Sequence, residues 1–296
     1  MKTLPPVLCL AVLATFALGQ SDRPSPAPAT RPAETAADEK LKAIEADYQH
    51  AQTTWSDQYR ATKTDAEREA LMKTRPDPKP YVARCWDVVS ASPGTKAAGK
   101  ALVWILRNAP AAGRESPERT KALALLEKNH LDDDTFVGAL QWMAMFGDTA
   151  SQAAVEHALN ASKNRDVRGN ACFTLAKMLK AQARTAEHLQ TAKCDELEAE
   201  KAFYGEDEVA RLRKIDVAKL GAEAVKHFRR TVSEFGDVRS SRGTLGEAAA
   251  SDLFELENLT IGKVAPDIVG EDIDGKPMKL SDFRGKVVVL DFWGNW

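Results

Sequence analysis

Apolar residues recur at helical spacing through most of the chain, from Glu39 to about Asn258. Early in this region they step by three and four residues, which places their side chains along one stripe of a long helix. The stripe consists of Leu41, Ile44, Tyr48, Ala51, Trp55 and Tyr59. A run with three prolines at residues 75–80 ends it, because proline blocks helix continuation. Residues 39–258 are therefore predicted to form an α-helical domain.

Shorter helices are predicted after this interruption, and polar turns separate them. Capping residues stand at several of their starts, namely Ser116, Asp134 and Asp148. The predicted ranges are 81–90, 94–107, 116–129, 134–146, 149–161, 166–182, 185–204, a helix through 225–235 that ends at Gly236, and 247–257. Helices of this length resemble the antiparallel helix pairs of tetratricopeptide or HEAT arrays. Because no fixed period is found, an irregular antiparallel helical domain is predicted, with a repeat-like domain as the alternative.

The cysteines, histidines and tryptophans of the helical region are predicted to be structural. Trp86, Trp104 and Trp142 lie on apolar helix faces and are expected in the core. Cys85 and Cys172 are interpreted as small buried apolar residues, and a Cys172–Cys194 disulfide is disfavoured because the two side chains lie on different faces of their predicted helices. The five histidines show no metal-ligand spacing, so neither a metal nor a cofactor is predicted.

The first residues have the pattern of a secretory signal peptide, predicted to span residues 1–19. Lys2 precedes an apolar run from Leu4 to Leu18, and small residues lead to Gly19. An uncleaved anchor, which would keep the protein near a membrane, is the alternative. Residues 20–38 are rich in Pro, Ala, Ser and Thr and are predicted to form an extended linker. The protein is therefore expected to be exported, to the periplasm or cell envelope.

The pattern changes from helical to extended after Leu259. Residues 268–273 and 278–280 flank an Asp-Gly turn and predict a β-hairpin. Residues 287–293 are apolar on both faces except at Asp291, as in a central strand covered on both sides. So short a segment cannot bury enough area to fold alone. We therefore expect poor packing there, with an exposed apolar strand prone to association.

Four sequence motifs in this last part resemble the opening of a redoxin domain. They are Gly262-x-x-Ala265-Pro266-Asp267, Asp274-Gly275-Lys276, Leu280 to Lys286, and Val287 to Trp296. Segment 261–296 thus resembles the N-terminal fragment of a TlpA/ResA-like domain, which has an α/β thioredoxin-like fold. The peroxidase branch related to AhpC/TSA is a weaker match. The fold predicted for the whole chain is mostly α, followed by the truncated start of this α/β fold.

The resemblance implies an exported thiol-disulfide oxidoreductase whose partners are protein thiols or disulfides. In this family a Cys-Gly-Pro-Cys motif follows at a helix N-terminus, where backbone amides lower the pKa of the attacking thiol. That motif would lie beyond Trp296, so residues 1–296 are expected to be inactive. Whether the chain belongs to an enzyme is left open, and the alternative is a helical protein-protein interaction module with a vestigial redoxin segment.

The resemblance also assigns candidate site residues at the end of the chain. Asp291 matches the position of a buried proton relay in thioredoxins, although a strand-end aspartate facing water is the simpler interpretation. The residues expected to flank the active-site turn are Phe292, Trp293, Gly294, Asn295 and Trp296. One hypothesis for why the chain ends at Trp296 is that a selenocysteine codon follows and was read as a stop. A nonsense mutation and an arbitrary fragment are the alternatives.

Composition narrows the class of protein further. The 296 residues have a formal net charge of -2, are 28% charged and 44% hydrophobic, and contain 7% aromatic residues. These values are ordinary for a folded globular domain. Nucleic-acid binding is not expected, because the chain lacks an excess of basic residues.

Overall fold

The computed structural model describes residues 31–109, 116–240 and 243–293. Within these ranges the fold is mostly α-helical, as predicted, with two small antiparallel hairpins. The helices are α1 (Arg31–Ala61), α2 (Asp65–Met72), α3 (Lys79–Ala91), α4 (Lys96–Asn108), α5 (Pro117–His130), α6 (Asp134–Phe146), α7 (Thr149–Ala161), α8 (Arg165–Thr191), α9 (Cys194–Tyr204), α10 (Glu206–Leu212), α11 (Val217–Phe235) and α12 (Leu245–Asn258). The strands are β1 (Arg239–Ser240), β2 (Gly243–Thr244), β3 (Val269–Glu271) and β4 (Pro277–Lys279), and a short 3-10 helix, η1, spans Leu280–Phe283.

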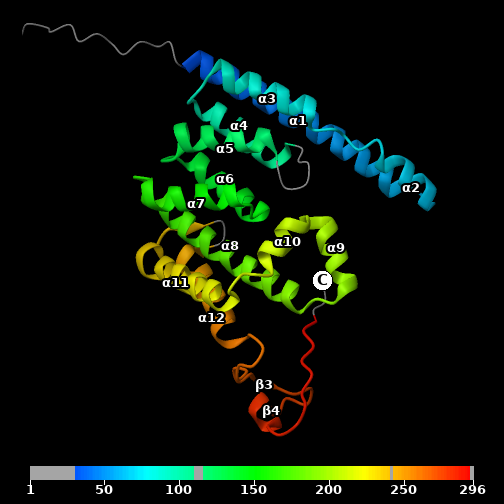
Figure 1. Cartoon of the computed structure of the whole chain (residues 1–296), viewed down its shortest axis with the longest axis vertical. Coiled ribbons are helices and arrows are strands. Elements are labelled where there is room, and N and C mark those ends of the chain that lie inside the picture. The colour runs from blue at the N-terminus through cyan, green and yellow to red at the C-terminus, as the bar shows by residue number, and fades with distance from the viewer. Residues whose placement is uncertain (1–30, 110–115, 241–242, 294–296) are drawn as a thin grey trace, which may run out of the picture.

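Helices α3 to α8 stack one after another, and α11 and α12 extend the stack beyond α8 (Figure 1). One continuous apolar core runs through it, from Ala37 on α1 to Ala249 on α12. Trp104 is buried in this core, while Trp86 and Trp142 pack against it half-buried, so the predicted core role of the tryptophans is confirmed. The described helices do not include one that is long and apolar enough to cross a membrane.

The predicted caps account for several of the helix starts. The Ser116 side chain accepts a hydrogen bond from the Arg119 amide at the start of α5, and Asp148 accepts one from the Ser151 amide at the start of α7. At α6 the cap is Asp133, one residue before the predicted position. Each cap satisfies an amide that would otherwise lack a partner in the first helical turn.

Helix α1 begins earlier than the sequence pattern suggests. It starts at Arg31, so residues 31–38 of the predicted linker are helical and not extended. Proline at position 32 is compatible with this start, because the first turn of a helix does not need its amide as a donor. Ala37 is buried in the core, which extends the apolar stripe by one more position. Residues 1–30, with the predicted signal peptide, lie outside the described ranges.

The break between the helices predicted over 166–182 and 185–204 lies at residues 192–193, between α8 and α9. The expected break is wrong: α8 continues to Thr191, and α9 starts at Cys194. Ala183, Ala186 and Leu189 are buried, so the apolar face continues through the expected turn. The last of these belongs to a separate small cluster with Val209 and Leu212, which holds the α9–α10 lobe against the end of α8.

The last helix, α12, is held tightly against the end of α11. The Gly246 amide donates to the Gly236 carbonyl at 3.1 Å. A side chain at position 246 would place its Cβ 2.8 Å from that carbonyl oxygen, so only glycine fits this contact. After α12 the chain leaves the helical body, and the β3–β4 hairpin lies at the far end of the molecule (Figure 1). None of residues 259–293 is buried.

Candidate active site

The predicted β-hairpin of the redoxin-like segment is confirmed. Strands β3 and β4 pair antiparallel, with Gly270 opposite Met278. The Asp272 side chain accepts hydrogen bonds from the amides of Asp274 and Lys276, both at 2.9 Å. Gly275 has φ 76°, a left-handed conformation that glycine adopts without a steric penalty. The Asp-Gly signal in the sequence therefore corresponds to a turn with a specific hydrogen-bond pattern.

Two of the family-like motifs are joined by one carboxylate. Asp267, from the Ala-Pro-Asp motif, accepts the Ser281 amide at 2.8 Å and the Ser281 hydroxyl at 2.9 Å. These hydrogen bonds, the amide first, lower the pKa of Asp267. The Leu280 amide donates to the Ile268 carbonyl at 2.9 Å alongside this contact. Asp267 therefore fixes the end of β4 and the start of η1 against the strand that precedes them.

The apolar run after η1 does not form a strand. The described residues from 287 onward have no regular secondary structure, and Val287 and Trp293 are 97% and 84% exposed. A central strand needs neighbours on both edges, and among the described residues no second strand lies beside this one. The expectation of poor packing and exposure here is confirmed.

The candidate site residues are therefore only partly placed. Asp291 and Phe292 are exposed, as is Trp293, and Asp291 has no hydrogen-bond partner within the described ranges. The other three flanking residues, Gly294, Asn295 and Trp296, lie outside the described residues. In its present surroundings Asp291 lacks the burial expected of a proton relay. Its relay role stays a prediction for a complete domain.

Two of the cysteines of the helical body, Cys85 and Cys172, are unsuited to redox chemistry because they are buried. Burial raises the pKa of Cys85 to about 12, helped by the negative charge of Glu45, and burial also raises the pKa of Cys172. Buried thiols of this kind are largely protonated and poorly reactive. All three described cysteines are free, and Cys194 is the exposed one. Cys172 is buried and Cys194 is exposed, and no disulfide joins them in the structure.

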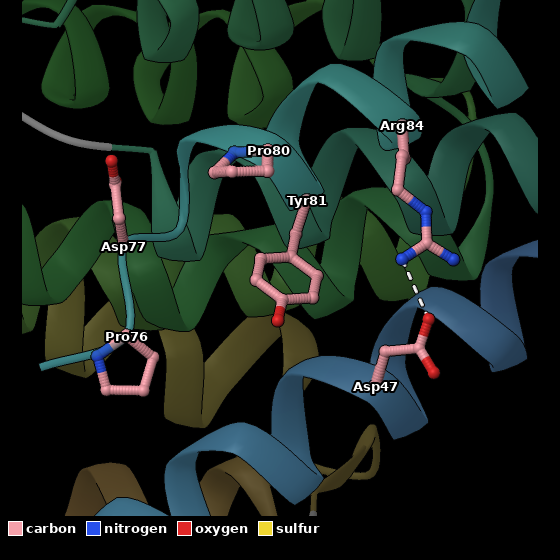
Figure 2. Close-up of a pocket in the computed structure, with 6 residues that line it drawn as sticks. All are labelled: Asp47, Pro76, Asp77, Pro80, Tyr81 and Arg84. Atoms are coloured by element: carbon pink, nitrogen blue, oxygen red, sulfur yellow. Dashed lines mark hydrogen bonds and ion pairs between the residues drawn. The ribbon is translucent and has the colours of Figure 1, made fainter.

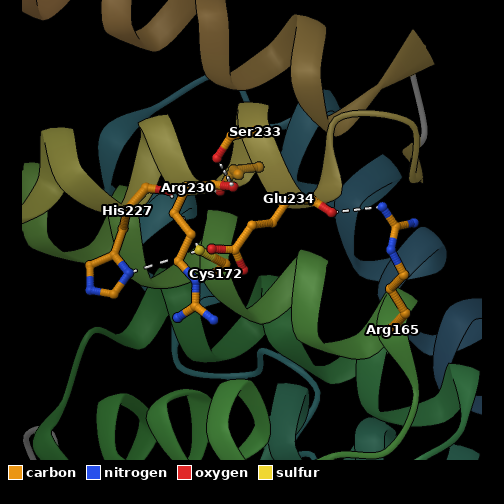
Figure 3. A network of polar contacts seen from close by, with 7 residues as sticks. Arg165, Cys172, His227, Arg230, Ser233 and Glu234 are labelled. Atoms are coloured by element: carbon orange, nitrogen blue, oxygen red, sulfur yellow. Dashed lines mark hydrogen bonds and ion pairs between the residues drawn. The ribbon is translucent and has the colours of Figure 1, made fainter.

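Cys172 has a polar partner that the sequence did not reveal. Its sulfur lies 3.8 Å from His227 Nδ1 on α11 and donates to the His227 carbonyl at 3.4 Å (Figure 3). Burial is the main cause that lowers the pKa of His227, so the pair is a neutral contact and not a thiolate–imidazolium ion pair. Only the packing of α11 on α8 brings the two residues together across 55 positions. The described residues contain no cluster of three or more metal-ligating side chains.

Lys180 on α8 is a buried cation that was not predicted from the sequence. Lys180 donates to Asp252 at 2.7 Å and to Glu255 at 2.8 Å, both on α12. Burial alone would lower the pKa of Lys180, but these hydrogen bonds outweigh burial and raise it. This contact fixes α12, and with it the exit of the chain toward the redoxin-like segment. Its signal in the sequence is weak, because a lysine within an apolar run is usually exposed.

Comparison with known proteins gives short local matches of one kind. The chain is 52% identical over 40 residues to the thiol-disulfide oxidoreductase ResA of Bacillus thuringiensis subsp. konkukian, which covers 14% of this chain and 23% of that protein. It is 50% identical over 55 residues to ResA of Bacillus thuringiensis strain Al Hakam, covering 18% and 32%, and 50% identical over 40 residues to ResA of Bacillus subtilis, covering 14% and 22%.

These matches support a relationship to thioredoxin-like redoxin proteins. The chain spans less than a third of the length of these relatives. No family model matches the chain. No solved structure matches it either.

Proposed function

We propose that this chain works as part of an exported thiol-disulfide oxidoreductase of the thioredoxin-like type. The observation that carries the proposal is the Asp267–Ser281 contact, which joins two of the family-like motifs in one structural unit. The local identity to ResA proteins supports the same assignment. Protein thiols or disulfides are the proposed substrates, and the predicted signal peptide supports a location in the periplasm or cell envelope.

The chemistry needs a reactive thiolate or selenolate and a second thiol that resolves the mixed disulfide. Cys85 and Cys172 are buried, and Cys194 is a single exposed thiol. The described residues therefore do not supply a dithiol, and we propose that residues 1–296 alone do not turn over. In a complete domain Asp291 would relay a proton to the resolving thiol, and the segment 292–296 would flank the reactive turn.

Reduction of insulin disulfides with dithiothreitol as reductant tests the proposal. The product of a reading frame extended past the codon of Trp296 should be active, and residues 1–296 should not. The first codon after that of Trp296 should be followed, in the same reading frame, by codons for Gly-Pro-Cys. Asp291→Asn in the extended product should slow turnover by about 100-fold and alter its pH profile. An extended product that folds but does not accelerate reduction would refute the enzyme assignment.

The second candidate function is a helical protein-protein interaction module. The supporting observation is that all buried residues of the main core lie between Ala37 and Ala249, while no residue of the segment 259–293 is buried. On this hypothesis the helical body folds and binds without the redoxin-like segment. Loss of insulin reduction together with retained helical folding in the extended product would favour this alternative.

A further inference from the structure

Residues 287–293 form the longest run of exposed apolar side chains in the described part of the chain. Every residue of the run except Asp291 is apolar, and all of them are exposed. Val287 and Val289 are 97% and 88% exposed, whereas Val288 and Leu290 are 41% and 50% exposed. Such alternation is typical of an extended backbone, in which successive side chains point to opposite faces. The segment therefore has the two faces of a strand, although it has no neighbouring strand.

The backbone of this segment is unpaired as well. No backbone hydrogen bond joins residues 287–293 to another residue in the described ranges. A segment with many β-branched and aromatic residues, a single charge and no proline pairs readily with any strand that offers it an edge. That strand has to come from a second molecule, because the described part of this chain does not supply one.

The β3–β4 hairpin of a second copy is a poor partner. Each of its strands has only three residues. Pro277 begins β4 and lacks the N–H group that a strand ladder needs. Residues 287–293 would leave most of their backbone groups unpaired against so short an edge.

The groove between α1 and α3 does not offer a strand edge either (Figure 2). Its apolar part includes Pro76 and Pro80, which have no N–H group to donate. At its rim Arg84 donates to Asp47 at 2.7 Å. An apolar strand bound there would cover this ion pair and take it out of water, which is unfavourable.

The identical segment of a second copy fits better. Two antiparallel strands related by a twofold axis place one residue opposite itself. Within residues 287–293, an axis at Leu290 gives five facing pairs in which both residues are apolar, whereas an axis at Val289 gives three and an axis at Asp291 four. The facing pairs for the axis at Leu290 are Val287 with Trp293 and Val288 with Phe292, each twice, Leu290 with itself, and Val289 with Asp291 twice.

We propose that residues 287–293 pair with the same residues of a second copy, antiparallel and about a twofold axis at Leu290. Val288, Leu290 and Phe292 of both strands then form one continuous apolar face. The inference does not rest on the proposed function. In a complete thioredoxin-like domain the same residues would instead pair within their own sheet.

The assembly should stop at a dimer. In an antiparallel sheet a third copy would run in the same direction as the first, about 9.6 Å away from it. This distance is less than the diameter of one helix, about 10–12 Å, so the attached helical bodies would collide. The paired strands bury on the order of 1,000 Å², the lower limit for a specific interface, and we therefore expect a Kd on the order of 10 µM.

Sedimentation equilibrium of a protein that starts at Gln20 tests the dimer, at concentrations between about 1 and 100 µM. Leu290→Lys places two ammonium groups opposite each other and should raise the Kd at least about tenfold. Ile273→Lys is the matched control, because Ile273 is a fully exposed apolar residue of the same segment outside the paired residues, and it should leave the Kd unchanged. A monomer at all concentrations, a larger assembly, or equal effects of the two substitutions would overturn the proposal.

Disulfide trapping tests the position of the axis. In a Cys194→Ser background, oxidised glutathione should cross-link Leu290→Cys between copies, because facing Cα atoms about 4.5–5.5 Å apart suit a disulfide. Val287→Cys should not cross-link, because the two copies of residue 287 lie about 20 Å apart along the paired strands. Cross-linking at both positions, at neither, or at residue 287 alone is incompatible with the proposed pairing.

Discussion

Removal of the buried ammonium group on α8 should destabilise the protein strongly. In Lys180→Met the side-chain volume is kept, but Asp252 and Glu255 lose their shared partner. Breaking a buried ion pair costs about 3–5 kcal/mol. The Glu255 side chain is 48% exposed and stays 4.0 Å from Arg184, so water and a second cation offset part of the loss. We therefore expect the free energy of unfolding to fall by about 2–3 kcal/mol.

Urea unfolding at pH 7, followed by circular dichroism, measures this loss. Lys177→Met is the matched control, because Lys177 is exposed on the same helix, and it should change stability by less than about 0.5 kcal/mol. The triple variant that also carries Asp252→Asn and Glu255→Gln should recover most of the loss, because no buried charge is left unpaired. Equal midpoints for Lys180→Met and the control would show that the contact contributes nothing.

The same contact gives a pH dependence with a defined sign. The folded-state pKa of Lys180 is raised, so its contribution is fully present below about pH 10 and is lost as the pH rises through the raised pKa. The hydrogen bond from Lys180 lowers the pKa of Glu255. The Glu255 contribution is therefore present above about pH 4.3 and is lost as the pH falls through the lowered pKa. The stability difference between wild type and Lys180→Met should thus shrink at both extremes of pH.

Three further results are expected. Gly246→Ala should lower the free energy of unfolding by about 2 kcal/mol in urea titration, because its Cβ would press on the backbone of Gly236; an unchanged midpoint would contradict the close packing. Asp267→Ala should speed amide hydrogen exchange at Ser281, because the carboxylate that accepts this amide is removed. In the wild type the protection of this amide should persist above about pH 3.9 and disappear as the pH falls through the lowered pKa of Asp267. Protection that is insensitive to the substitution would rule the contact out. In a protein that starts at Gln20, Cys194 should react rapidly with a thiol reagent and the buried cysteines only after unfolding, so two or more fast thiols would contradict the assigned burial.

The sequence predicted the structure correctly where neighbouring residues alone determine it. The caps at Ser116 and Asp148 fixed helix starts because a cap depends on residues within one turn. The Asp-Gly hairpin was predictable for the same reason. The false break before residue 185 arose because neither glycine nor proline marks the true end of α8 near Thr191.

Features that depend on packing between helices could not be predicted. The Cys172–His227 contact and the ion pairs of Lys180 join residues 55 to 75 positions apart, and only the packing of α11 and α12 on α8 brings them together. The predicted strand at residues 287–293 shows the reverse case. Its apolar pattern is typical of a central strand, but a strand forms only when its edges find partners, and none is present in the described part of the chain.

The α9–α10 lobe packs on α8 through an apolar cluster of its own, so it can be altered separately from the main core. Its small cluster of Leu189, Val209 and Leu212 is separate from the main core, and α8 is the shared support of both. A new binding loop could therefore replace the connection at Gly205 without disturbing the stacked helices. In engineering terms, the connection at Gly205 offers a graft position on the helical scaffold.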